Sequence, residues 1–112
     1  MIIHKKGIDM TGAQPQTVHA MHVLDSVYAK HGYDECWITS INDGTHSRGS
    51  RHYIGLAFDA RSKTIATLTD KFDILADVRR ALGYQYDVLL EHVGSDNEHY
   101  HVEFDPKSSA TF

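Results

Sequence analysis

The segment from Tyr86 to Asp105, YDVLLEHVGSDNEHYHVEFD, decides the fold. Residues 86–91 and 99–105 have the composition of two short strands. Between them, residues 94–97 (GSDN) are typical of a turn. We therefore expect two neighbouring strands here, and a short connection of this kind joins antiparallel partners.

Two helices are predicted outside this segment. The first runs from Pro15 to His31, because proline suits the first helical turn and Gly32 suits the C-terminal stop. The second follows Thr67, which begins a capping-box-like sequence, and ends at Gly83. Each has apolar residues at helical spacing for a core-facing side. These residues are Ala20, Val23, Leu24 and Val27 in the first helix, and Phe72, Leu75, Val78 and Leu82 in the second.

Two more strands are expected at residues 36–41 and 56–61, so that the order is helix, strand, strand, helix, strand, strand. Strands gathered in pairs favour an α+β fold, a small and mainly antiparallel sheet flanked by helices, over a doubly wound parallel sheet. With 112 residues the chain can bury one core, and we expect a single domain over residues 1–112.

The composition disfavours several classes of protein. The 11 basic and 15 acidic residues give a net charge of -4, whereas a nucleic-acid binder usually carries a basic field, so we expect no nucleic-acid partner. No apolar run approaches the roughly 20 residues that span a bilayer, so we expect no membrane insertion. The first residues lack the long apolar stretch of a signal peptide, and we expect synthesis and folding in a cytoplasm. We also expect a monomer. Cys36 is the only cysteine, which leaves no intramolecular disulfide and no Cys-rich zinc site.

Nine histidines in so short a chain raise the prospect of metal chemistry. The sequence has no phosphate-binding loop, dinucleotide fingerprint, nucleophile elbow or HExxH helix. Two clusters remain: residues 50–59 (SRHYIGLAFD) and residues 98–103 (EHYHVE).

The two clusters together contain a zinc ligand set. His52 and Asp59 are an odd number of residues apart, so they converge only if the chain turns between them, and Gly55 suits such a turn. With His101 they give two imidazoles and one carboxylate, a catalytic zinc shell with one position open for water. Glu98 is out of phase with His101 and is expected to lean over the site from the strand entrance, where it would act as general base.

Several neighbouring residues keep two interpretations each. His99 shares a strand face with His101, so it either replaces His101 as a ligand or lines the cleft. Glu103 either orients a ligand imidazole or is an ordinary strand-face carboxylate. His46 is a substrate contact or a plain loop residue, and Ser50 either tethers its loop or touches substrate.

At these residues the sequence resembles the zinc D-Ala-D-Ala metallopeptidases. That family includes bacterial cell-wall carboxypeptidases, vancomycin-resistance dipeptidases and phage endolysins that cut between L-alanine and D-glutamate. Its pattern is S-x-H-x-x-G-x-A-x-D followed later by E-x-x-H. The first part matches residues 50–59 and the second matches residues 98–101.

The resemblance implies the hedgehog/DD-peptidase fold, Zn²⁺ held by His52, Asp59 and His101, and Glu98 as general base. In the family an arginine upstream of the S-x-H element stabilises the scissile carbonyl. This chain has Thr-Ser-Ile-Asn-Asp at residues 39–43 instead, without an arginine. We expect Arg48, or else Arg51, to take that role, and Arg48 and Ser50 to contact substrate.

The expected function is hydrolysis of peptidoglycan stem peptides, of the D-Ala-D-Ala carboxypeptidase or the L-Ala-D-Glu endopeptidase type. A phage lysis enzyme fits best, one that accumulates in the host cytoplasm and reaches the cell wall after the membrane is permeabilised. The alternatives are a non-catalytic module of the same fold that binds wall peptide or a virion protein, and a metal-dependent hydrolase of another class.

Overall fold

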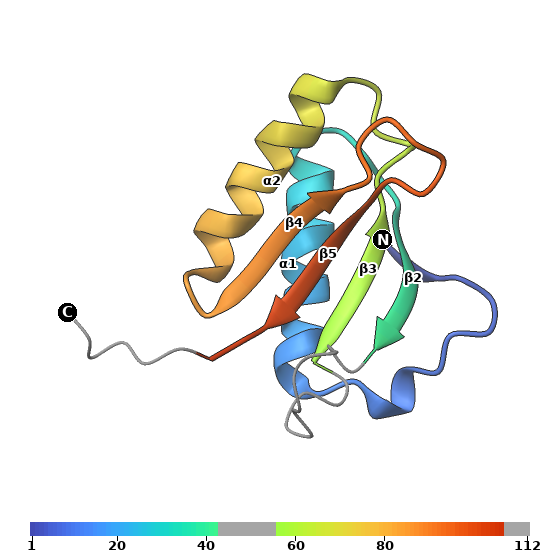
Figure 1. Cartoon of the computed structure of the whole chain (residues 1–112), viewed down its shortest axis with the longest axis vertical. Coiled ribbons are helices and arrows are strands. Elements are labelled where there is room, and N and C mark those ends of the chain that lie inside the picture. The colour runs from blue at the N-terminus through green and yellow to red at the C-terminus, as the bar shows by residue number, and fades with distance from the viewer. Residues whose placement is uncertain (43–55, 107–112) are drawn as a thin grey trace.

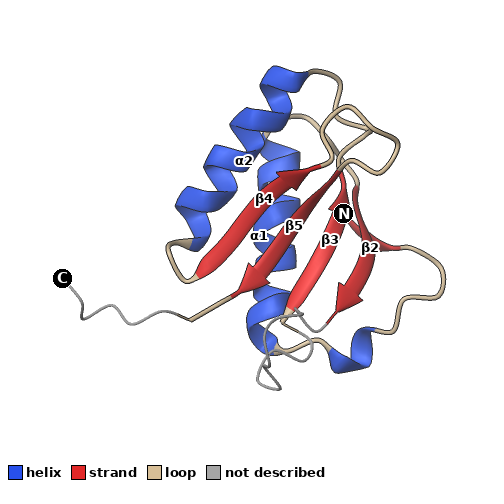
Figure 2. Cartoon of the chain, viewed as in Figure 1, coloured by secondary structure: helices blue, strands red, loops and turns tan. Residues whose placement is uncertain are grey.

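The computed structural model describes residues 1–42 and 56–106. They form a five-stranded sheet with both long helices packed on one of its faces (Figures 1 and 2). The elements in chain order are β1 (Ile2–His4), the 3-10 helix η1 (Met10–Gly12), α1 (Pro15–Lys30), β2 (Cys36–Asn42), β3 (Ala57–Arg61), α2 (Leu68–Leu82), β4 (Tyr86–Glu91) and β5 (His99–Phe104).

The strands lie in the order β1-β2-β3-β5-β4. The pairs β2–β3, β3–β5 and β4–β5 are antiparallel, whereas β1 pairs parallel with β2. The α+β class and the mainly antiparallel sheet are confirmed, although the sheet as a whole is mixed. The parallel strand β1 and the helix η1 were not predicted, because β1 has three residues and depends on a partner more than 30 positions away.

The core lies between the sheet and the helices, and it is built by the period-two alternation of the strands. Phe58 on β3 and Tyr100 and Val102 on β5 point toward the helices and are buried. Tyr28 on α1 packs edge to face against Tyr100, with ring centroids 6.1 Å apart. The two buried hydroxyls are hydrogen-bonded, since Tyr28 donates to the carbonyl of Arg61 and Tyr100 to that of Lys71.

The helix boundaries follow the predicted signals. The Thr67 hydroxyl accepts a hydrogen bond from the Asp70 amide at 3.0 Å, and Gly83 ends α2 with a φ of 84°. One predicted core position is wrong, because Phe72 is 47% exposed and Ile74 is fully buried instead. The core-facing side of α2 is centred on Ile74 and Val78, and Phe72 lies about 140° around the helix from that centre. None of the helices in the described part of the chain is long and apolar enough to cross a membrane.

Asp77 on α2 joins the two helices. One carboxylate oxygen lies 2.8 Å from Nε2 of His31, at the end of α1, and 3.7 Å from Nζ of Lys30, and the other lies 2.7 Å from Arg80. The hydrogen bond with His31, followed by that with Arg80, lowers the pKa of Asp77 to about 2.

We expect Asp77→Asn to lower the midpoint of thermal unfolding at neutral pH. The lowered pKa means that the ionised carboxylate stabilises the fold above its ordinary pKa of 3.8, and that this stabilisation is lost as the pH falls through about 2. Thermal unfolding followed by circular dichroism should therefore show a difference from the unmodified protein that shrinks as the pH approaches 2. Asp73→Asn, at an exposed position on the same helix, is the control; an equal effect of both substitutions would contradict the assignment.

Candidate metal centre

The candidate centre lies on the face of the sheet opposite the helices. The strand register aligns Ser40, Asp59, His101 and Leu89 across four adjacent strands. Asp59 and His101, two of the three predicted zinc ligands, are direct partners in this row. The register of β3 and β5 therefore brings together residues that are 42 positions apart in the chain.

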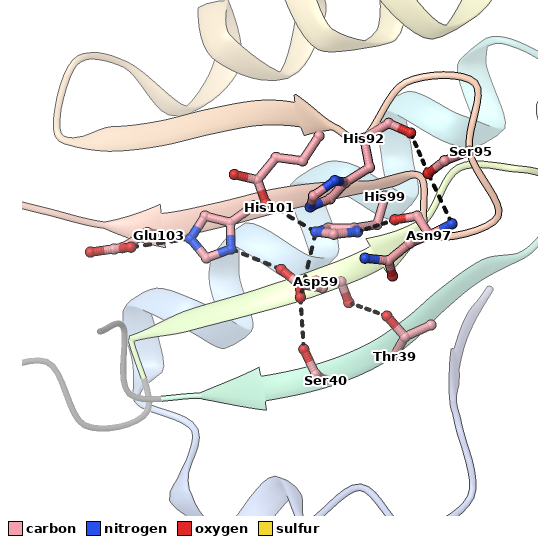
Figure 3. Close-up of polar contacts among 10 residues, drawn as sticks. Thr39, Ser40, Asp59, His92, Ser95, Asn97, His99, His101 and Glu103 are labelled. Atoms are coloured by element: carbon pink, nitrogen blue, oxygen red, sulfur yellow. Dashed lines mark hydrogen bonds and ion pairs between the residues drawn. The ribbon is translucent and has the colours of Figure 1, made fainter. Parts of the chain in front are cut away.

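Asp59 and His101 contact each other directly (Figure 3). Oδ1 of Asp59 lies 2.8 Å from Nδ1 of His101, and Oδ2 accepts a hydrogen bond of 3.0 Å from the Ser40 hydroxyl. The second ring nitrogen of His101 lies 3.1 Å from Oε1 of Glu103. Glu103 therefore orients the imidazole, which is one of the two roles that the sequence left open.

A β-bulge in β2 provides the Ser40 contact. The register between β2 and β3 shifts by one residue between Ile38 and Ser40. The extra residue brings both Thr39 and Ser40 beside Asp59, since the Thr39 hydroxyl lies 3.4 Å from the Asp59 carbonyl oxygen. Without the bulge, Ser40 would point toward the core like Ile38.

The contact favours the ionised form of the Asp59 carboxylate and the protonated form of the His101 imidazole. Burial alone would raise the pKa of Asp59, but the hydrogen bond with His101, the nearby His99 and the Ser40 hydroxyl together lower it. The hydrogen bond with Asp59 raises the pKa of His101 to about 9, burial opposes the shift and Glu103 adds to it. A metal bound at Nδ1 of His101 would therefore replace a proton.

His99 lies in the same cluster, two residues before His101 on the same face of β5. Its Nε2 lies 3.0 Å from Oε1 of Glu91 and 3.7 Å from Oδ2 of Asp59, and its Nδ1 lies 2.6 Å from the carbonyl oxygen of Asn97 (Figure 3). His99 is thus near enough to Asp59 for either predicted role, ligand or cleft wall. Its ring also stacks obliquely with that of His92, with centroids 5.7 Å apart.

Imidazole nitrogen and carboxylate oxygen are donor types that zinc accepts. Ligand atoms around a tetrahedral zinc ion lie roughly 3.3–3.6 Å apart. The 2.8 Å between Oδ1 of Asp59 and Nδ1 of His101 is shorter than this and is a hydrogen-bond distance. Within residues 1–42 and 56–106, no three His, Cys, Asp or Glu side chains form a group already placed to hold an ion. The third predicted ligand, His52, lies outside the described residues, as do His46, Arg48, Ser50 and Arg51.

Glu98 points into the protein rather than toward Asp59 and His101. It is 4% exposed, and its Oε1 lies 2.6 Å from Nζ of Lys71 and accepts a hydrogen bond from the Ser62 hydroxyl at 2.8 Å. Its Oε2 accepts a hydrogen bond from the Gly94 amide at 3.0 Å. Burial alone would raise the pKa of Glu98, but these three partners together lower it.

Glu98 nevertheless borders the candidate centre. We call the polar hollow the space of about 340 Å³ between β2, β3 and the turn before β5, which is lined by Asp59, Glu98 and His99 among others. A larger groove of about 940 Å³ crosses β4 and β5 and is lined by Asp59, His101 and Glu103. Asp59 therefore lines both spaces, and His101 lines the groove.

Comparisons of this chain with protein-family models, with curated proteins and with solved structures find no match.

Four residues around the centre were not identified from the sequence. Arg61 could have been, because it follows Asp59 by two and therefore shares its strand face. Glu91 and Lys71 could not, because their positions depend on the register of β4 and on the packing of α2 against the sheet. Ser62 could not either, because its contact depends on Glu98 pointing into the protein.

We expect Glu98→Ala to lower the free energy of unfolding by about 3 kcal/mol. The substitution leaves Lys71, whose side chain is 16% exposed, beside a cavity without its carboxylate. Urea denaturation measures the loss, and the double variant Glu98→Ala/Lys71→Ala should lose less than the sum of the two single variants. Additive losses would show that the two charges do not stabilise each other.

We expect His101 in chelator-treated protein to titrate with a pKa of about 9. Because this value lies above the ordinary 6.5, the ion pair stabilises the fold fully below 6.5 and loses its effect as the pH rises through 9. Asp59→Asn should return the pKa toward 6.5, and NMR titration of the imidazole carbons measures both values. An unchanged pKa in Asp59→Asn, with Asp73→Asn as the control, would contradict the pairing.

Proposed function

We propose that this chain is a zinc-dependent peptidase that hydrolyses peptide bonds in peptidoglycan stem peptides. The bond would be of the D-Ala-D-Ala or the L-Ala-D-Glu type. The single observation that carries the proposal is the contact between Asp59 and His101, at 2.8 Å. The two residues come from the separate halves of the sequence pattern, and each half is predicted to supply zinc ligands.

The residues around this contact have distinct roles in the proposal. Asp59 and His101 hold the metal together with His52, and Ser40 and Glu103 fix the orientation of the two described ligands. Bound zinc supplies a Lewis acid and a water whose pKa approaches neutrality. The groove of about 940 Å³ beside His101 has room for an extended peptide.

Glu98 is proposed as the group that accepts and returns the proton. Its carboxylate is ionised at neutral pH, as a base requires, but the lowered pKa makes Glu98 a weaker base than an ordinary glutamate while its partners hold it. Acting on substrate requires Glu98 to exchange one of its partners, Ser62 or the Gly94 amide, for water in the polar hollow. Arg48 and Ser50 remain the proposed substrate contacts.

The finer assignments belong to the same proposal. The fold would be of the hedgehog/DD-peptidase type, and the biological setting that of a phage lysis enzyme released to the cell wall. The antiparallel arrangement of β3 and β5, with one ligand on each, supports the first of these assignments.

A second candidate function is a non-catalytic module that binds wall peptide or a virion protein. One observation favours it: both oxygens of Glu98 are engaged inside the protein, by Lys71, Ser62 and the Gly94 amide. A carboxylate held in this way serves the fold whether or not it ever accepts a proton.

Digestion of purified peptidoglycan, with mass spectrometry of the released fragments, tests the proposal. We expect new termini within stem peptides, lost on chelation and restored by zinc. His101→Ala should abolish cleavage and stoichiometric zinc binding together, because it removes a ligand. Asp73→Asn, a substitution at an exposed position on α2 that lines neither space, should leave both unchanged.

Glu98→Gln separates the two candidate functions. The amide keeps the shape and one acceptor oxygen but cannot take up a proton, so a peptidase should lose about 100-fold or more in kcat while its fold and zinc content persist. Zinc binding without any cleavage by the unmodified protein, of wall or of D-Ala-D-Ala peptides, would support the binding module and reject the peptidase.

A further inference from the structure

The polar hollow combines cationic side chains with one end of the candidate centre. Lys5, Arg61 and Lys63 line it, and Asp59 and His99 form the end nearest the proposed reacting atoms. We propose that this hollow binds the free terminal carboxylate of a peptide substrate, and that Arg61 is the residue that contacts it. The inference rests on the proposed function and specifies its substrate: a peptide cut next to its C-terminus.

Arg61 lies where such a contact needs it. It is on β3, two residues after Asp59, so both side chains emerge on the same face of the sheet, and its register partner on β5 is His99. The guanidinium carbon lies 4.8 Å from the centre of the Trp37 ring. The indole of Trp37 in turn donates to Glu35 at 3.0 Å. Stacking of this kind holds a flexible side chain in one plane before a ligand arrives.

The guanidinium of Arg61 has N–H groups with which it can donate hydrogen bonds to a ligand. Among the residues that the structure describes, no carboxylate forms an ion pair with Arg61. Its planar fork of N–H groups matches the two oxygens of a carboxylate, and such bidentate pairs are among the stronger hydrogen-bonded contacts in proteins.

The charge balance of the hollow favours an anion. Three carboxylates also line it, but Asp59 faces His101 and Glu98 faces Lys71, so two of the three already have a positive partner. The third, Asp96, is on the exposed turn before β5. The three cations therefore outweigh the remaining negative charge at this end of the centre.

The size of the hollow favours a chain end over a chain interior. Its volume of about 340 Å³ lies at the small end of the range of roughly 300–1,000 Å³ for ligand pockets. The groove on the other side of Asp59 and His101, about 940 Å³, is the larger space. A substrate would then lie with its long part in the groove and its last residue, ending in a carboxylate, in the hollow.

The test compares two acetylated peptides that end in D-Ala-D-Ala, one with a free C-terminal carboxylate and one with a C-terminal amide. We expect the zinc-loaded protein to cleave the free acid with a kcat/KM about 10- to 100-fold higher. Arg61→Gln should remove this preference, mainly through KM, and Arg61→Lys should keep part of it. Lys30→Gln, which removes a positive charge from α1 on the helix side, should leave the preference unchanged.

Binding without catalysis provides a second measurement. In chelated protein, the free-acid peptide should shift the NMR signals of the Arg61 Nε–H and of the Trp37 indole, and the amide peptide should not. Equal cleavage of both peptides by the unmodified protein would overturn the inference and leave the peptidase intact. Carboxylate-selective binding without hydrolysis of any peptide would retain the hollow and reject the peptidase. Neither selective binding nor hydrolysis would overturn both.

Discussion

The antiparallel register between β3 and β5 is the constraint on which the rest of the structure depends. It pairs Asp59 with His101 on one face of the sheet and, by alternation, sends Phe58, Tyr100 and Val102 into the core on the other. A slip of one residue would exchange the two faces, exposing the aromatic core and burying the charged cluster. The hydrophobic energy of the core therefore enforces the register that assembles the candidate centre.

Local signals were enough to predict most of the architecture. The hydroxyl of Thr67 and the glycine at position 83 define α2 through hydrogen bonds and dihedral angles that involve only neighbouring residues. Features that depend on distant partners were missed. The strand β1 exists because β2 pairs with it, and the bulge at Thr39 and Ser40 exists because β3 fixes the register around it. Phe72 fitted the predicted apolar stripe, but the packing of α2 turned the side centred on Ile74 and Val78 inward and left Phe72 exposed.

The candidate centre also has one part that the sequence predicted and one part that it did not. The meeting of Asp59 with His101 was predictable, because a motif that spans two strands carries information about their register. The surroundings of Glu98 were not. Its phase along β5 is that of Tyr100 and Val102, so its side chain points toward the helices. There it meets Lys71, which lies on the core-facing side of α2 and gives the buried carboxylate a positive partner.

The interior charge pair and the open-face cluster are linked through the turn before β5. The Glu98 carboxylate accepts a hydrogen bond from the Gly94 amide. In the same turn the Ser95 hydroxyl donates to the His92 carbonyl and accepts a hydrogen bond from the Asn97 amide, and the Asn97 carbonyl oxygen lies 2.6 Å from Nδ1 of His99 (Figure 3). Moving Glu98 would therefore shift the support of His99, and with it the wall of the polar hollow. A loss of activity in a Glu98 variant has two physical origins, proton transfer and turn geometry. Only a variant that preserves the turn, judged by its stability and its ligand binding, assigns the loss to the first.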